Sequence, residues 1–191
     1  MIKIILASSS PRRSQILKEA GFEFEILKID VDELFDAAMS INQVPLYLAK
    51  KKMFAAKQLI KNDSIIITAD TVVILENSII GKPENEEDAF RILKALSGKM
   101  HSVITGVCIR RNEIELEVES ITKVYFETVT DEEINFYLQN YKPYDKAGAY
   151  AIQEWIGINK ISKIEGDYYN VVGFPMSKIY PVLMELKESQ R

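Results

Sequence analysis

Apolar residues recur along the chain with two different periods, and the elements they predict alternate between strands and helices. Residues 2–7 form a short apolar run typical of a buried strand, and the serines and proline at 8–11 predict the start of a helix that stops at Gly21. Alternation over 22–30 and the apolar run 64–69 predict two further strands. Between them, residues 45–60 place apolar side chains on one stripe at helical spacing, which predicts a long helix.

The second half of the chain shows the same mixture. Apolar segments at 72–75 and 79–80 flank a turn at 76–78 and predict a hairpin, and helical spacing follows over 85–97. Period two dominates from 100 to 127, Thr130 and Glu133 form a capping box that opens another helix, and the last helix is expected over 176–188. No repeat or low-complexity tract interrupts residues 1–191, so we expect a single mixed α/β domain.

Composition restricts the chemistry that this domain can perform. Charged residues make up 27% of the 191 residues and leave a net charge of -4, so no overall field attracts the chain to nucleic acid. No apolar run approaches the ~20 residues of a membrane helix, and no signal peptide is recognisable, so we expect a cytoplasmic protein. The single cysteine, Cys108, lies in an apolar segment and is interpreted as a buried hydrophobe, while a lone His101 excludes multi-histidine zinc sites. Catalysis would therefore depend on carboxylates, lysines, arginines and a metal.

Two arginines stand where the helix dipole disfavours cations. Arg12 and Arg13 fall in the first turn of the first predicted helix, directly after a serine-rich turn whose backbone N–H groups can bind phosphate. Guanidinium groups beside such a turn would form a polyphosphate site. The alternative is that both arginines point to solvent, because the dipole penalty is only a few tenths of a kcal/mol.

Three further charged residues are candidates, each with a structural alternative. On a helical wheel Lys52 falls within the apolar arc of its helix, whereas Lys51 does not, so Lys52 is either an inward-pointing functional group or a lysine at the edge of the core. Asp70 follows the apolar run 64–69 at what should be the end of a central strand, where α/β proteins gather ligand chemistry, although an aspartate there can simply cap a turn. Lys82 lies on a loop between Gly81 and Pro83, and the sequence leaves its role open.

Together these segments closely resemble the Maf family of nucleotide pyrophosphatases, in family order over nearly the whole chain. The matching blocks are LASSSPRRSQIL, Val31-Asp32-Glu33, Lys52, Ala69-Asp70-Thr71-Val72-Val73, Gly81-Lys82-Pro83, the stretch from Leu96-Ser97-Gly98 to Thr105-Gly106-Val107, Asp145-Lys146-Ala147-Gly148-Ala149-Tyr150, and Gly166-Asp167 through Pro175.

The resemblance implies a fold and an activity. The fold would be a Maf/ITPase-like twisted mixed sheet in two lobes with a central cleft, and the reaction would be cleavage of a nucleoside triphosphate between its α and β phosphates. Asp70 would accept the proton of the attacking water and would share a divalent metal, Mg²⁺ or Mn²⁺, with Glu33. The triphosphate would be bound by Ser8, Arg13, Lys52 and Lys82.

Three positions are similar to the family branch that acts on dTTP and UTP, including modified pyrimidine nucleotides. They are Arg12 after the proline, Thr71 after the aspartate, and Gln153, whose amide can pair with both a donor and an acceptor on a pyrimidine edge. Met53 and Trp155 depart from the family pattern, and Trp155 bears on the pocket near Gln153.

Other functions stay open at this point. One is the same chemistry with another base preference, and a second is a non-catalytic nucleotide-binding or nucleic-acid-binding regulator of septum formation and cell division, although the acidic composition disfavours a stable nucleic-acid partner. Tyr47 and Phe54, on the outer side of their helix, further suggest a homodimer.

Overall fold

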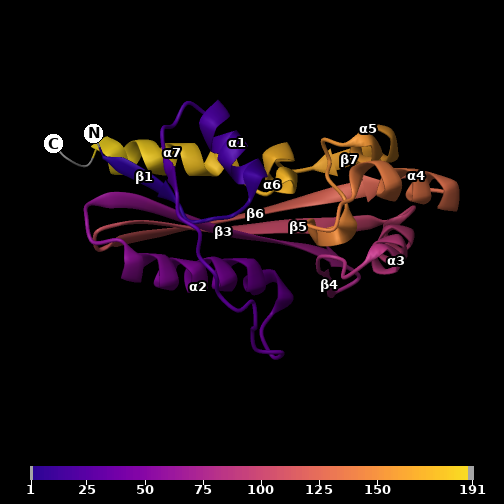
Figure 1. Cartoon of the computed structure of the whole chain (residues 1–191), viewed down its shortest axis with the longest axis horizontal. Helices are drawn as coiled ribbons and strands as arrows, with labels where there is room; N and C mark the ends of the chain where they lie inside the picture. Colours follow the sequence, from indigo (N-terminus) through magenta and orange to yellow (C-terminus); the bar gives the residue numbers. More distant parts are fainter. Residues whose placement is uncertain (1, 189–191) are drawn as a thin grey trace. The chain divides into compact units, whose positions relative to one another are not determined.

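The computed structural model describes residues 2–188, and seven strands of this part of the chain form one mixed sheet in the order β2-β1-β3-β5-β6-β7, with β4 beside β3 (Figure 1). β1 is parallel to β2 and β3, whereas β4 is antiparallel to β3 and β7 is antiparallel to β6. This arrangement confirms the predicted α/β class. The strands are β1 Lys3–Leu6, β2 Glu25–Ile26, β3 Ser64–Leu75, β4 Ser78–Ile80, β5 Met100–Arg111, β6 Ile114–Phe126 and β7 Ile161–Glu165.

The helices agree with the sequence pattern wherever that pattern is long enough to show a period. The capping box of Thr130 and Glu133 is present, and Asn85 caps the helix expected over 85–97 through its side chain. The helices are α1 Pro11–Glu19, α2 Val44–Leu59, α3 Glu86–Leu96, α4 Asp131–Tyr141, α5 Trp155–Lys160, α6 Tyr168–Val172 and α7 Met176–Glu188, with 3-10 turns η1 Ile41–Gln43 and η2 Ala147–Ala149.

The first of two compact units comprises residues 2–70, 105–120 and 173–188. In it α2 lies on one side of the strands, and α1 and α7 lie on the other (Figure 1). Small residues let α2 approach closely, since a Cβ added to Gly106 of β5 would lie 2.4 Å from the α2 backbone. Cys108 is fully buried against α2 and burial raises the pKa of its thiol to about 12, which confirms its interpretation as a buried hydrophobe.

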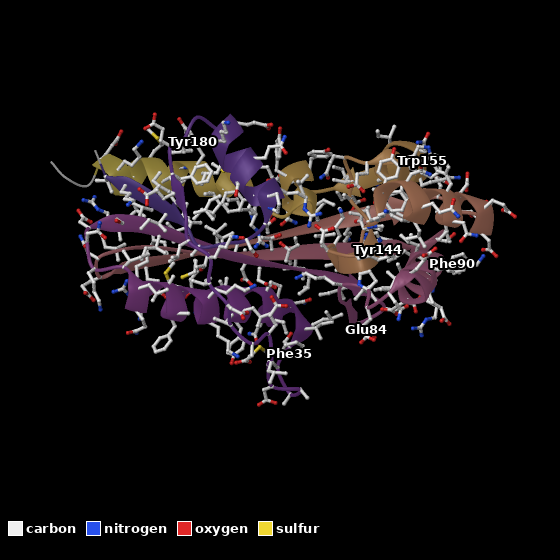
Figure 2. The ribbon with its side chains drawn as sticks, viewed as in Figure 1. Phe35, Glu84, Phe90, Tyr144, Trp155 and Tyr180 are labelled. Atoms are coloured by element: carbon white, nitrogen blue, oxygen red, sulfur yellow. The ribbon has the colours of Figure 1, made fainter. Side chains whose placement is uncertain are left out.

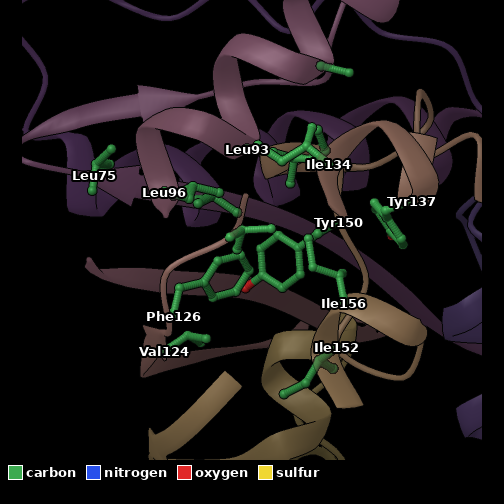
Figure 3. Close-up of a cluster of buried hydrophobic side chains, with 14 of the residues drawn as sticks. Leu75, Leu93, Leu96, Val124, Phe126, Ile134, Tyr137, Tyr150, Ile152 and Ile156 are labelled. Atoms are coloured by element: carbon green, nitrogen blue, oxygen red, sulfur yellow. The ribbon is translucent and has the colours of Figure 1, made fainter. Parts of the chain in front are cut away.

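The second unit comprises residues 71–104 and 121–172 and has its own core. Leu93 of α3, Ile134 of α4 and Tyr150 belong to this buried cluster (Figure 3). His101 is also buried here, with Nε2 2.7 Å from the Tyr150 hydroxyl, and burial lowers its pKa to about 4. His101 is therefore neutral at physiological pH and is a core residue. Two units agree with the two lobes that the resemblance implies.

Several expectations about individual elements are wrong. The strand expected over 22–30 is reduced to Glu25–Ile26, which pair with Ile5 and Leu6 of β1. The sequence pattern does not indicate α5, β7 and α6, since helices of five and six residues are too short to show a period and the strand sequence ISKIE does not alternate. The run 64–69 and the segment 72–75 form one strand rather than two.

Among the described residues, no helix has both the length and the apolar character that crossing a membrane would require.

Candidate active site

The turn after β1 leads into the N-terminus of α1. Ser10 is the N-cap of α1 and Pro11 lies in its first turn, while the Ser10 N–H donates to Ser8 Oγ at 3.2 Å. Ser10 makes no side-chain capping bond, and the first turn of α1 contains no acidic residue. The N–H groups and positive dipole at this end of the helix therefore favour an anion, and the largely buried Ser8 lies beside them.

Arg13 points back from α1 and connects three segments of the first unit. Its Nε donates to the Gly173 carbonyl at 3.0 Å, and its Nη1 donates to the Ala69 carbonyl at 2.8 Å and to Ser8 Oγ at 3.3 Å. Burial lowers the pKa of Arg13 while the charge of Asp70 raises it, and a guanidinium stays protonated at neutral pH in either case. The alternative that both arginines point to solvent is wrong for Arg13.

Lys52 connects two carboxylates. From α2 its Nζ donates to Glu33 Oε1 at 3.1 Å and to Asp70 Oδ1, and its side chain is only 16% exposed. The adjacent Lys51 bonds instead to Asp32, which confirms that the two lysines differ in direction. Asp32 and Glu33 belong to residues 27–40, which contain no helix or strand. Their ion pairs with Lys51 and Lys52 therefore hold this segment against α2.

Asp70 lies inside β3, and the expectation that it ends a strand is wrong. The parallel ladder with β1 stops at Ile67 and β4 pairs with β3 from Val73 to Leu75, while β5 is the other neighbour of β3 in the sheet. Asp70 falls between these successive partners, 8% exposed. Burial raises the pKa of its carboxyl and outweighs the opposing charges of Lys52 and Arg13. A carboxylate with a raised pKa is a stronger base than an ordinary aspartate.

These contacts bring five of the predicted site residues into one network within the first unit: Ser8, Arg13, Glu33, Lys52 and Asp70. Arg12 lies next to this network, half-buried, and makes no hydrogen bond or ion pair among residues 2–188. A buried carboxylate that bonds Lys52 and lies in the field of Arg13 is suited to accepting a proton beside a bound polyanion.

The remaining three predicted residues belong to the second unit. Thr71 directly follows Asp70 along β3 and is half-buried. Lys82 is exposed on the loop after β4. This loop is held at Gly81, whose carbonyl accepts a hydrogen bond from the Gly148 N–H at 3.0 Å. Gln153 is exposed in the turn before α5.

The profile of a family described as "Maf-like protein" matches residues 3–186. The chain belongs to the Maf family. Relatives named dTTP/UTP pyrophosphatase include those of Flavobacterium johnsoniae, 45% identical over 96% of this chain and 95% of that protein, and Phocaeicola vulgatus, 43% identical over 96% of each. The relative of the same name in Cytophaga hutchinsonii is 46% identical over 96% of this chain and 84% of that protein.

Glu33 and Asp70 are the two carboxylates of this network whose chemistry can be tested against a metal. The described residues contain no group of three or more acidic, histidine or cysteine side chains that could enclose a metal by themselves. Two carboxylates that share the Lys52 ammonium nevertheless fit Mg²⁺, which is commonly held by one or two carboxylates together with substrate phosphates and waters. The donor set therefore fits a metal that binds together with a triphosphate.

One polar network of the second unit does not follow from the sequence pattern. The buried Tyr137 hydroxyl contacts Glu154 and the Ala151 N–H, on both sides of Gln153. Helical spacing from Ile134 is typical of a core position for Tyr137, which is buried, but the period says nothing about its hydroxyl. The available signal was chemical, because a buried tyrosine hydroxyl usually has a hydrogen-bond partner.

Proposed function

We propose that this Maf protein hydrolyses dTTP and UTP, including modified pyrimidine nucleotides, to the monophosphate and pyrophosphate. The observation that carries the proposal is the buried Asp70 carboxylate, which bonds Lys52 and lies in the field of Arg13. It is supported by relatives 43–46% identical over almost the whole chain that are named for this activity.

In the proposed reaction a water oxygen attacks the α-phosphorus, the bond from that phosphorus to the bridging oxygen breaks, and pyrophosphate leaves. Asp70 accepts the proton that the water loses. An ordinary aspartate, of pKa about 3.9, is nearly 12 pKa units below water at about 15.7, which is roughly 16 kcal/mol uphill. The raised pKa of Asp70 narrows this gap. A Mg²⁺ or Mn²⁺ ion held by Glu33 and Asp70 would lower the pKa of water and offset phosphate charge.

The cations bind and stabilise the triphosphate. Lys52 uses two of its three N–H donors on Glu33 and Asp70 and keeps a third for a phosphate oxygen. Arg13 has already placed Nε and Nη1 on protein oxygens, so its main contribution is to hold Ser8 beside Ala69 and to supply positive charge. We assign the remaining phosphate contacts to Arg12 and Lys82.

Selection of the base is assigned to the second unit. Thr71 and the exposed Gln153 present a hydroxyl and an amide, which together can donate to and accept from the edge of a pyrimidine. A site built on such hydrogen bonds discriminates strongly, because the wrong base leaves its polar groups unpaired. Free nucleoside triphosphates as substrates are consistent with a cytoplasmic location.

The test measures pyrophosphate release from dTTP, UTP, dCTP, CTP, dATP and GTP, with Mg²⁺ or with EDTA. We expect release from dTTP and UTP that EDTA abolishes. Asp70→Asn should lose release but still bind dTTP in calorimetry, because the amide keeps the shape and cannot accept the proton. Glu113→Gln, which neutralises a carboxylate 98% exposed, should retain wild-type rates. Binding without release by the wild type would favour a non-catalytic regulator, and full turnover by Asp70→Asn would remove the base assignment.

We also propose a homodimer through the outer face of α2. Phe54 is 63% exposed and Tyr47 38% exposed there, and both line a groove of about 420 Å³. Lys57 and Glu115 line the same groove, so a two-fold copy can set a cation against a carboxylate. Light scattering should give twice the chain mass for the wild type and the chain mass for Phe54→Glu. A monomeric wild type would remove the proposal.

A further inference from the structure

Gln153 has no hydrogen bond of its own within residues 2–188, so its direction depends on the backbone that carries it. That backbone forms a tight turn, closed by the Glu154 N–H donating to the Ala151 carbonyl at 3.1 Å. An exposed glutamine on a freely moving turn would sample many directions, and it would then discriminate poorly between bases.

A single buried hydroxyl joins the two ends of this turn. Tyr137 of α4 is fully buried, and its hydroxyl accepts a hydrogen bond from the Ala151 N–H at 3.2 Å and donates one to a carboxylate oxygen of Glu154. The other carboxylate oxygen of Glu154 lies 3.5 Å from Lys146 Nζ. The Tyr137 hydroxyl therefore holds Ala151, two positions before Gln153, and Glu154, one position after it.

The middle of the turn has no room to shift toward α5. A Cβ added to Gly157 would lie only 1.9 Å from the Ile152 carbonyl oxygen, so the turn rests directly on the helix backbone. Tyr137, Ile152 and Ile156 belong to one buried cluster (Figure 3). Trp155, the first residue of α5, is labelled in Figure 2, and its ring packs against that of Phe136 of α4. The Tyr137 hydroxyl is therefore the one group that bonds both ends of this turn, in addition to the turn's own hydrogen bond, the Lys146 ion pair and the packing.

We propose that Tyr137, acting through Glu154, is a positioning residue that sets the direction of Gln153 and thereby the preference among pyrimidine bases. The inference rests on the proposed function, since it concerns how that same site selects its base. It differs from a role in stability, because loosening the turn should affect the preferred base more than a base that Gln153 does not match.

The experiment compares kcat/KM for dTTP and dCTP, which differ on the pyrimidine edge that an amide can read. Tyr137→Phe removes only the hydroxyl and should lower the dTTP/dCTP ratio on the order of tenfold, the scale of the net free energy of one hydrogen bond. Tyr141→Phe is the matched control. Tyr141 lies one turn further along α4, stacks on Tyr137 and is 38% exposed, so removal of its hydroxyl should leave the ratio unchanged.

A double-mutant cycle tests whether the effect passes through Gln153. Gln153→Ala should lower the ratio by itself, and Tyr137→Phe added to it should lower the ratio no further. Equal losses for both nucleotides in Tyr137→Phe, or additive effects in the double variant, would overturn the inference. If Tyr137→Phe does not fold, Glu154→Ala removes the carboxylate that accepts the hydrogen bond of the Tyr137 hydroxyl and serves the same comparison. A wild type that cleaves no nucleotide would instead overturn the proposed function.

Discussion

Replacing Arg13 with lysine keeps the positive charge and removes the forked donor. The guanidinium reaches the Gly173 and Ala69 carbonyls at 3.0 and 2.8 Å with two different nitrogens, whereas the single nitrogen of lysine can reach only one of them. A buried acceptor left unsatisfied costs about 1–3 kcal/mol. We therefore expect Arg13→Lys to lower the free energy of unfolding by about 2 kcal/mol, and a chain of this length should lose roughly 4–8 °C in Tm.

Arg12→Lys is the matched control, because Arg12 is the neighbouring residue and makes no hydrogen bond or ion pair in the described part of the chain. It should change the free energy of unfolding by no more than about 0.5 kcal/mol. Both variants are measured by urea unfolding followed by circular dichroism. If Arg13→Lys is as stable as the wild type, or if Arg12→Lys is destabilised equally, the two contacts of the Arg13 guanidinium do not stabilise the fold as we argue.

Two further predictions concern pH dependence and packing. The base must be a carboxylate, so activity is lost as the pH falls through the pKa of Asp70; Lys52 lowers that pKa and Glu33 raises it. The acid limb of kcat/KM should accordingly move to higher pH in Lys52→Gln and to lower pH in Glu33→Gln, and movement in the same direction would contradict the arrangement. Gly106→Ala forces a Cβ to 2.4 Å from the α2 backbone and should cost about 1–3 kcal/mol in thermal unfolding. Gly81→Ala, with open space around it, should stay within about 0.5 kcal/mol; equal Tm values for both would argue against the close contact.

Elements with a long period could be predicted from the sequence, and so could the direction of some side chains. The wheel position of Lys52 pointed it inward because a 16-residue helix fixes direction at every residue. Short elements could not be predicted, because five or six residues do not complete enough turns to establish a period. The sequence pattern predicts two strands where the structure has β3, because the charged Asp70 interrupts the apolar run. The length of the strand is set instead by the partners available on either side.

By itself, the sequence determined the α/β class, the capped helices and the residue types from which any catalytic site must be built, since these depend on local spacing and chemistry. Only the tertiary structure decided which groups share a proton or a hydrogen bond. Lys52 lies 19 residues from Glu33, and Arg13 lies 160 residues from Gly173. Contacts across such separations depend on how the sheet brings its strands together, and no local pattern specifies which oxygen a given nitrogen will meet.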